Sequence, residues 1–245
     1  MLIASLTTIP PRIQDECKLT IDSLMNQVDI IYLCVCETYE RFGPMNIPKY
    51  LSQEPYITRV KVIMGADHGS ATKYLGAIQY IKNQNQDTWV FVCDDDQEYH
   101  PDLVKRMCDV ATKKSCVYQN RYDIFKLYGT QGGFIHGYVG LFIHSSILCK
   151  LETFPLPLIA KHIDDQWMSA FCFLHNIEIY STNINEYSDI YKVLNGLYEK
   201  IGKEPLESIG GRDERIQKLE RYFSIKFHNV TVMHDSKNVH HDHTH

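Results

Sequence analysis

Three consecutive aspartates, Asp94, Asp95 and Asp96, follow directly after the apolar run "WVFVC". Adjacent carboxylates raise one another's pKa unless a cation neutralises them, so this cluster indicates a bound cation. Carboxylate oxygens suit Mn²⁺ or Mg²⁺, which also bind the phosphate groups of substrates. Because alternate residues of a turn point the same way, Asp94 and Asp96 are the pair expected to face one ligand. The alternative is a solvated acidic turn that caps the next helix.

Polar side chains follow two other apolar runs. The segment "TTIPPRI" offers the hydroxyls of Thr7 and Thr8 and the cation Arg12, and "GADHGSATKY" offers Asp67 and Lys73. A helix from about residue 70 would aim its N-terminal N–H groups at the same place. Each group also has an ordinary structural interpretation, but together they suit the base, ribose and diphosphate of a nucleotide.

The elements that must position these residues are β-strands about thirty residues apart. Four apolar runs begin near residues 2, 30, 60 and 89, with helices expected at 14–27, 70–83 and 101–113. This spacing suits β-α-β units, and strands with continuous hydrophobicity suit a parallel sheet that helices cover on both faces. The predicted fold is an open α/β sheet, whose ligands bind beyond the carboxyl ends of the strands.

The rhythm breaks after residue 115. The segments "SCVYQN", "YDIFKLYG" and "VGLFIHSSIL" predict strands of a mixed sheet, and a helix is expected at about 164–175. Two helical segments follow, "DIYKVLNGLYEKIG" and "RDERIQKLERYFSIKFHN", the second with Ile216, Leu219 and Phe223 on one face. The His-rich residues 236–245 are expected to form a flexible tail.

A second acidic pair, Asp164 and Asp165, opens the helix predicted at 164–175. Helix capping is the alternative to a catalytic role, because acids stabilise helix N-termini. In the glycine-rich segment 129–140, Gly133, His136 and Gly137 are candidates for a place where the backbone closely approaches a ligand, and the alternative is a turn between two strands. Trp167 could stack on an apolar face of a ligand, although buried core aromatics are commoner.

Composition limits the classes of function. The chain has 245 residues, of which 44% are hydrophobic, enough for one large domain or for one domain with a small appendage. A formal net charge of -5 argues against nucleic acid or an anionic membrane as the main partner. Eight cysteines without a CxxC pair indicate buried free thiols. With no predicted signal peptide or membrane span, a cytoplasmic location is expected.

The order of these motifs over residues 1–182 resembles the GT-A type glycosyltransferases, of the small single-domain kind also found in large DNA viruses; for a viral enzyme the compartment would be the host cytoplasm. The resemblance implies a Rossmann-like GT-A domain over 1–182, with a nucleotide-binding half at 1–114 and an acceptor half at 115–182. A helical extension over 183–235 would pack on the same domain.

The resemblance also assigns roles to residues. Asp94 would contact the ribose or a metal-bound water, and Asp96 would bind the metal directly. The nucleotide pocket would take Thr7, Thr8, Arg12, Asp67, Lys73 and Asp95. The donor-sugar and acceptor pocket would take Gly133, His136, Gly137 and Trp167. His234 in "VTVMHDS" would be a further metal ligand, with His228 and the tail histidines as competitors, and Asp165, slightly favoured over Asp164, would be the general base of an inverting transfer.

The predicted function is metal-dependent transfer of a sugar from a nucleoside-diphosphate sugar, UDP-sugar favoured, to a glycan or other hydroxyl acceptor. Alternatives are a phosphoryl- or nucleotidyl-transfer enzyme and a non-catalytic sugar-binding module. An aspartyl phosphatase would have its Asp after the first strand, where this chain has Thr7 and Thr8. A nucleotidyltransferase would have a glycine-rich basic loop there, and "TTIPPRI" contains no glycine.

Overall fold

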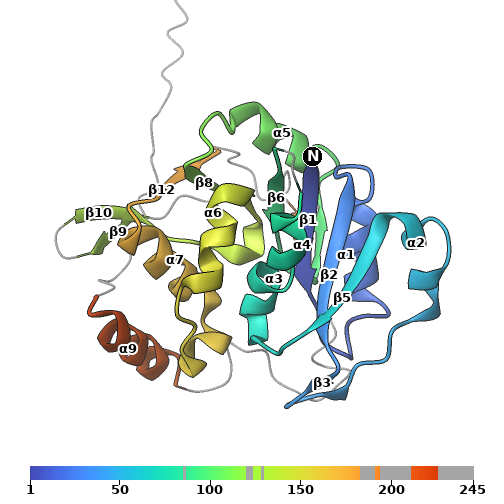
Figure 1. The fold of residues 1–245 in the computed structure, drawn as a ribbon, viewed down its shortest axis with the longest axis horizontal. Helices are drawn as coiled ribbons and strands as arrows, with labels where there is room; N and C mark the ends of the chain where they lie inside the picture. Colours follow the sequence, from blue (N-terminus) through green and yellow to red (C-terminus); the bar gives the residue numbers. More distant parts are fainter. Residues whose placement is uncertain (85–86, 120–123, 128–129, 183–190, 194–210, 226–245) are drawn as a thin grey trace, which may run out of the picture.

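The computed structural model describes residues 1–84, 87–119, 124–127, 130–182, 191–193 and 211–225. Its centre is a seven-stranded sheet of order β12-β8-β11-β6-β1-β2-β5 (Figure 1). The strands are β1 (Leu2–Thr7), β2 (Ile30–Cys36), β5 (Val60–Gly65), β6 (Trp89–Val92), β8 (Cys116–Gln119), β11 (Leu141–His144) and β12 (Glu178–Ser181).

The sheet is mixed, as predicted. β1 runs parallel to β2 and β6, β2 to β5, and β8 to β12, whereas β11 is antiparallel to both β6 and β8. The prediction of an open α/β sheet flanked by helices is therefore confirmed. The four apolar runs form strands because both faces of the sheet are covered.

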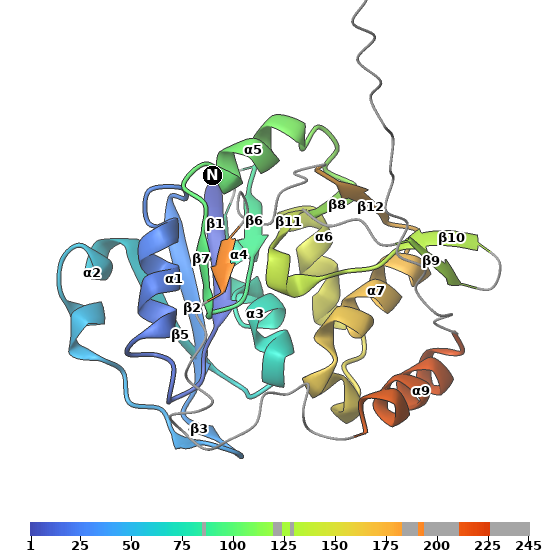
Figure 2. The same cartoon turned by 180° about the vertical axis from the view of Figure 1, so that it is seen from behind.

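Alternate side chains of each strand enter two hydrophobic cores. Ile3, Val90 and Val92 pack on one face, whereas Ala4 and Phe91 pack on the other. The first core includes residues of α3 (Thr72–Leu75), α4 (Ile78–Lys82), α6 (Ser145–Leu148) and α7 (Asp164–Leu174). The second includes residues of α1 (Glu16–Leu24) and α5 (Leu103–Val110), and Figures 1 and 2 show the two helical layers from opposite sides.

The strand order places the candidate site. The chain builds outward from β1 through β2 to β5 and then returns to form β6 on the other side of β1. Open α/β sheets bind ligands at such a reversal, which here lies at the carboxyl ends of β1 and β6. We call this place the β1–β6 crevice. Thr7 ends β1 and Thr8 follows it, and Asp94 to Asp96 come shortly after β6, so both motifs lie at this crevice.

The helix expected over 70–83 is broken into η2 (Gly69–Ala71), α3 and α4. Two close approaches accompany the breaks. Gly69 has a φ of +62°, and a Cβ there would lie 2.1 Å from the Lys161 carbonyl oxygen. At Gly76 a Cβ would lie 2.6 Å from the Cys34 Cβ, so the glycine lets the turn after α3 pack directly on β2.

Three other predictions need correction. The run "VGLFIHSSIL" leaves the sheet after His144, whose side chain accepts a hydrogen bond from the Ser146 N–H and so caps α6. In "DIYKVLNGLYEKIG", Tyr191–Val193 form a strand, β13, antiparallel to β7 (Gln97–Tyr99), and the rest lies outside the described residues. Helix α9 (Arg212–Phe223) is present but ends at Phe223, before the predicted end, because Ser224 takes a left-handed conformation.

The remaining elements are short. They are β3 (Thr38–Tyr39), β4 (Gly43–Pro44), η1 (Lys49–Ser52), α2 (Tyr56–Arg59), β9 (Ile124–Leu127), β10 (Thr130–Gly133), η3 (Gly137–Val139), η4 (Cys149–Thr153) and η5 (Leu158–His162). All eight cysteines are free thiols. Among the described helices, none has both the length and the apolar composition needed to cross a bilayer.

Candidate active site

The loops after β1 and β6 are joined by a buried charge network. Thr8 Oγ1 donates a 2.5 Å hydrogen bond to Asp95 Oδ2. Arg12 Nη1 lies 3.1 Å from Asp95 Oδ1 and 2.6 Å from Asp96 Oδ2. Asp95 is therefore an anchor that points into the protein, whereas its neighbours face outward.

The alternation expected for the triple-aspartate turn is present. The side chains of Asp94 and Asp96 are 32% and 24% exposed, against 4% for Asp95. Burial raises the pKa of Asp95 to about 7, although Arg12 opposes the shift, and burial raises the pKa of Asp96 as well. The raised values mean that the attraction of Arg12 does not fully offset the cost of burying these carboxylates.

A second network joins the β6 turn to the start of α7. Lys73 Nζ lies 2.6 Å from Asp94 Oδ1 and 2.8 Å from Asp164 Oδ2, and its side chain is only 3% exposed. Burial lowers the pKa of Lys73, but Asp164 and Asp94 outweigh it and leave the pKa well above its usual value. Ser70 Oγ donates a hydrogen bond to Asp164 Oδ1. Lys73 is thus a fixed ammonium that links the two acidic motifs.

Asp165 occupies the next position in this cluster. The Gly137 N–H donates to Asp165 Oδ1 over 2.8 Å. Burial, followed by the neighbouring charge of Asp164, raises the pKa of Asp165 to about 8. A Cβ on residue 137 would lie 2.6 Å from Asp165 Oδ1 and 2.9 Å from Lys73 Nζ, so only glycine allows this close approach.

The other predicted residues fall at different distances from the cluster. Thr7 Oγ1 is buried at the end of β1, with no hydrogen-bond partner among the described residues. Asp67 Oδ1 accepts a hydrogen bond from the Gly69 N–H, and with Cys36 and Glu37 it lines a hollow of about 370 Å³ at the carboxyl ends of β2 and β5. His234 lies outside the described residues.

The glycine-rich segment is only partly at the cluster. Gly137 lies at the cluster, next to Asp165. Gly133 is the last residue of β10. His136 donates its backbone N–H to Gln119 Oε1 over 3.0 Å, and its ring contacts Phe134 and Tyr138 edge-on. The predicted sugar contact of Trp167 is wrong: this side chain is 0% exposed and donates its Nε1–H to the Pro155 carbonyl. Its apolar ring packs in the core, and its N–H is bonded to the backbone.

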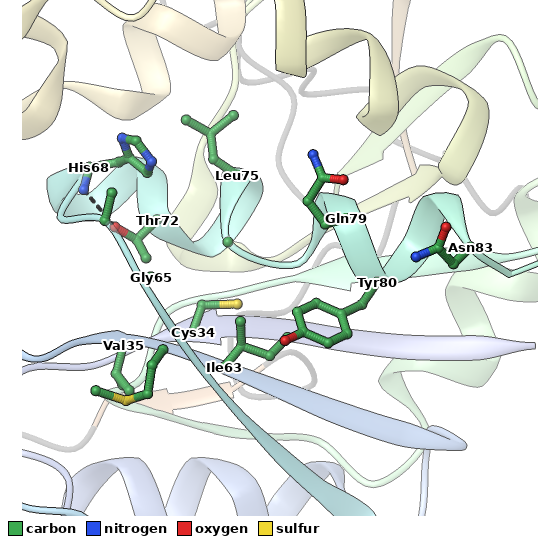
Figure 3. A pocket seen from close by; sticks show the side chains of 13 residues that line it. Cys34, Val35, Ile63, Gly65, His68, Thr72, Leu75, Gln79, Tyr80 and Asn83 are labelled. Carbon is green, nitrogen blue, oxygen red and sulfur yellow. Dashed lines mark hydrogen bonds between the residues drawn. The ribbon is translucent and has the colours of Figure 1, made fainter.

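A larger hollow of about 460 Å³ opens beside β5, between this edge strand and helices α3 and α4 (Figure 3). The rings of Tyr80 and His68 and the amide of Gln79 line it, above Cys34 and Ile63. It shares Met64 and Gly65 with the hollow at Asp67. The charged cluster lies outside both hollows.

Sequence reasoning missed Ser70 and Tyr74. Both lie in "GSATKY" with Lys73, and the spacing i, i+3, i+4 places the three residues on one face of a helical segment. That periodicity, applied to polar residues, is the signal that could have found them. Tyr74 is fully buried next to Lys73.

The cluster is compatible with a divalent ion only together with a ligand. Within the described ranges, no group of three or more His, Cys, Asp and Glu side chains could hold a metal ion. Mg²⁺ commonly uses one or two carboxylates and takes its other ligands from water and substrate phosphates. Asp94 and Asp96, both partly exposed at the crevice, fit that smaller requirement.

Comparisons with known proteins give only distant similarity. No protein-family model matches the chain, and no curated protein matches it significantly. The structure is similar to the inositol-1-phosphate CTP transferase from T. maritima (14% identity, 85% of this chain, 96% of that chain, TM-score 0.44). It is also similar to HddC from Yersinia pseudotuberculosis (13% identity, 61% and 78%, TM-score 0.38).

A third similar structure is the glycosyltransferase GlyE in Streptococcus pneumoniae TIGR4, with 14% identity and a TM-score of 0.39. The match covers 74% of this chain and 44% of that one. All three TM-scores lie below 0.5, a likeness too distant to assign an activity. The function must therefore be argued from the residues of the site.

Proposed function

We propose that this protein is a metal-dependent glycosyltransferase that moves a sugar from a nucleoside-diphosphate sugar, UDP-sugar favoured, to a hydroxyl acceptor such as a glycan. The observation that carries the proposal is the cluster at the β1–β6 crevice. There five aspartates, Asp94, Asp95, Asp96, Asp164 and Asp165, meet two cations, Arg12 and Lys73. The excess negative charge suits a divalent ion that carries a diphosphate.

The donor would lie along the crevice. Asp94 and Asp96 would hold Mn²⁺ or Mg²⁺, whose charge would stabilise the diphosphate as the bond to the anomeric carbon breaks. Lys73, fixed between Asp94 and Asp164, adds a second positive charge close to the leaving group. The nucleoside would lie at the hollow beside Asp67 and near Thr7, whose hydroxyl has no hydrogen-bond partner among the described residues.

Asp165 is the residue that would act on the acceptor hydroxyl as a general base. It is a partly buried carboxyl, held by the Gly137 N–H, with a pKa near 8 that suits proton transfer around neutral pH. Asp164 is less suited because Ser70 and Lys73 already bind both of its oxygens. In an inverting transfer Asp165 would take the proton of the acceptor hydroxyl while that oxygen attacks the anomeric carbon.

The β1 loop weighs against nucleotidyl transfer. A nucleotidyltransferase needs a loop that can surround a triphosphate, whereas here Thr8 and Arg12 are both bound to aspartates of the β6 turn. A sugar-binding module would not need the buried ammonium or the second acidic pair.

The test is release of nucleoside diphosphate from a panel of UDP- and GDP-sugars with Mn²⁺, with water as the slow acceptor. We expect release from at least one donor, its loss in Asp96→Ala, and a fall of about 10³-fold in Asp165→Asn. Pyrophosphate exchange with nucleoside triphosphates would instead support nucleotidyl transfer. Binding without any release would support a sugar-binding module.

A further inference from the structure

Tyr74 has a buried hydroxyl that the fold leaves unused. The side chain is 0% exposed, and its oxygen has no hydrogen-bond partner among the described residues. Its ring is held in an edge-on contact with Trp167, with 6.2 Å between ring centroids. A buried hydroxyl without a partner destabilises the folded protein, so a phenylalanine would suit the core better.

The hydroxyl is directed at the catalytic cluster. A Cβ on Gly137 would lie 3.2 Å from Tyr74 Oη, 2.9 Å from Lys73 Nζ and 2.6 Å from Asp165 Oδ1. The three polar groups therefore surround the point where a Cβ of residue 137 would lie. Within the described part of the chain, Lys73 makes ion pairs with Asp94 and Asp164, which leaves one of its three N–H donors for a further partner.

These groups are chemically complementary. A tyrosine hydroxyl both accepts and donates, a lysine ammonium only donates, and an ionised carboxylate only accepts. Burial keeps the pKa of Tyr74 well above its usual value, so the hydroxyl retains its proton. The arrangement suits a bridge from Lys73 through Tyr74 to Asp165.

We propose that Tyr74 is a positioning residue for the transfer reaction: when substrate fills the site, its hydroxyl accepts a hydrogen bond from Lys73 and donates one to Asp165. The inference rests on the proposed function, with Asp165 as the base. Hydrogen bonds of catalytic groups often tighten only once substrate is bound, which is consistent with the unpaired hydroxyl here. The bridge would hold the Asp165 carboxylate toward the acceptor hydroxyl.

The test compares Tyr74→Phe with Tyr118→Phe, using Mn²⁺ and a nucleotide sugar that the wild type hydrolyses. The Tyr118 hydroxyl, away from the cluster, accepts a 2.8 Å hydrogen bond from the Lys113 N–H. For Tyr74→Phe we expect an unchanged or higher Tm, a donor KM within about twofold of wild type, and a kcat lower by about tenfold or more. For Tyr118→Phe we expect a lower Tm and an unchanged kcat.

Two results would overturn the proposal while leaving the proposed function intact. One is a Tyr74→Phe variant with wild-type kcat. The other is a Tyr74→Phe variant whose Tm falls as in Tyr118→Phe, since this would show that the hydroxyl is structural. If the wild type releases no nucleoside diphosphate from any donor, the proposed function fails, and the role of Tyr74 fails with it.

Discussion

At the scale of single residues, the site depends on carboxyls whose environments differ. Asp95 is buried and paired with Arg12 and Thr8, whereas Asp94 and Asp96 keep partial exposure. Asp165 lies among acids, with the Gly137 N–H as its hydrogen-bond donor. In the proposed function, aspartate would therefore serve as anchor, metal ligand or base according to its surroundings.

Asp165→Asn should show a stability change that depends on pH. The folded protein holds the Asp165 proton up to about pH 8, whereas an unfolded aspartate releases it near pH 4. The Asp165 carboxyl therefore makes the wild type progressively less stable as the pH rises from about 4 to about 8. Asparagine does not ionise, so the variant lacks this pH-dependent loss of stability. We expect the Tm advantage of the variant to be smallest near pH 4 and to widen toward pH 8.

Thermal unfolding of both proteins at several pH values measures this difference. The same carboxyl must be ionised to act as a base, so wild-type kcat/KM for donor hydrolysis should rise with pH up to about 8. A Tm difference that stays constant from pH 4 to 8 would contradict the assigned environment of Asp165.

At the scale of elements, the turn after β6 is positioned by the loop after β1. Arg12 contacts Asp95 and Asp96 from that loop, and parallel pairing of β1 with β6 brings the two strand ends together. On the other face, Lys73 from α3 bonds to Asp94, and its carbonyl accepts a hydrogen bond from Ser5 of β1 over 2.7 Å. The cluster thus depends on three separate elements.

Arg12→Gln should destabilise the protein because it leaves two carboxylates without their cation. We expect a loss on the order of 3 kcal/mol at pH 8, measured by urea unfolding. The loss should be smaller at pH 5, because Asp95, with a pKa near 7, is then largely neutral. The control is Lys105→Gln, which breaks an exposed i,i+4 pair with Asp109 and should cost less than about 0.5 kcal/mol. Equal losses in the two variants would contradict the network.

Much of this arrangement could be predicted from the sequence, because buried parallel strands are long apolar runs. The runs at β1, β2, β5 and β6 were therefore predicted correctly, and with them the edge where the acids and hydroxyls meet. The breaks at Gly69 and Gly76 could not be predicted, since they depend on contacts with Lys161 and Cys34. β13 was missed because a helix-like pattern there is overridden by pairing with β7.

The partners of the site residues were also beyond prediction. The sequence indicated Lys73 and Asp164 as separate candidates, but nothing in it pairs residues 91 positions apart. Trp167 was predicted to contact a sugar but is buried in the core. The sequence cannot separate the two cases, because an aromatic residue beside a predicted site is as compatible with the core as with a ligand. The positions of candidate site residues can be predicted from the ends of the strands. Their contacts cannot, because these depend on packing between segments that are distant in the sequence.

At the scale of the whole molecule, helix α9 supports the acidic start of α7. Leu219 of α9 is 0% exposed, and Ile216 and Phe223 pack against the same core as α7. Phe223 stacks on Phe154 with 5.0 Å between ring centroids. Because α9 also lies against η5, which ends just before Asp164, it helps to fix the start of α7.

Leu219→Ala should therefore cost about 2–5 kcal/mol, as expected for a large-to-small change in a core. Urea unfolding measures the loss. Tyr222→Ala is the matched control on the same helix: its side chain is 55% exposed, and we expect a change within about 0.5 kcal/mol. A neutral Leu219→Ala would mean that α9 does not pack on the core in solution.

The central claim is that a divalent ion and a nucleoside diphosphate bind together at the β1–β6 crevice, and thermal unfolding with UDP and Mn²⁺ tests it most directly. At about 100 times the Kd, the pair should raise Tm by about 5–10 °C, and each alone should raise it far less. Glu98→Ala, an exposed change in the next strand, should keep this response, and Asp96→Ala should lose it. No stabilisation by UDP or GDP with Mn²⁺ or Mg²⁺, or an equal response in Asp96→Ala, would contradict the account.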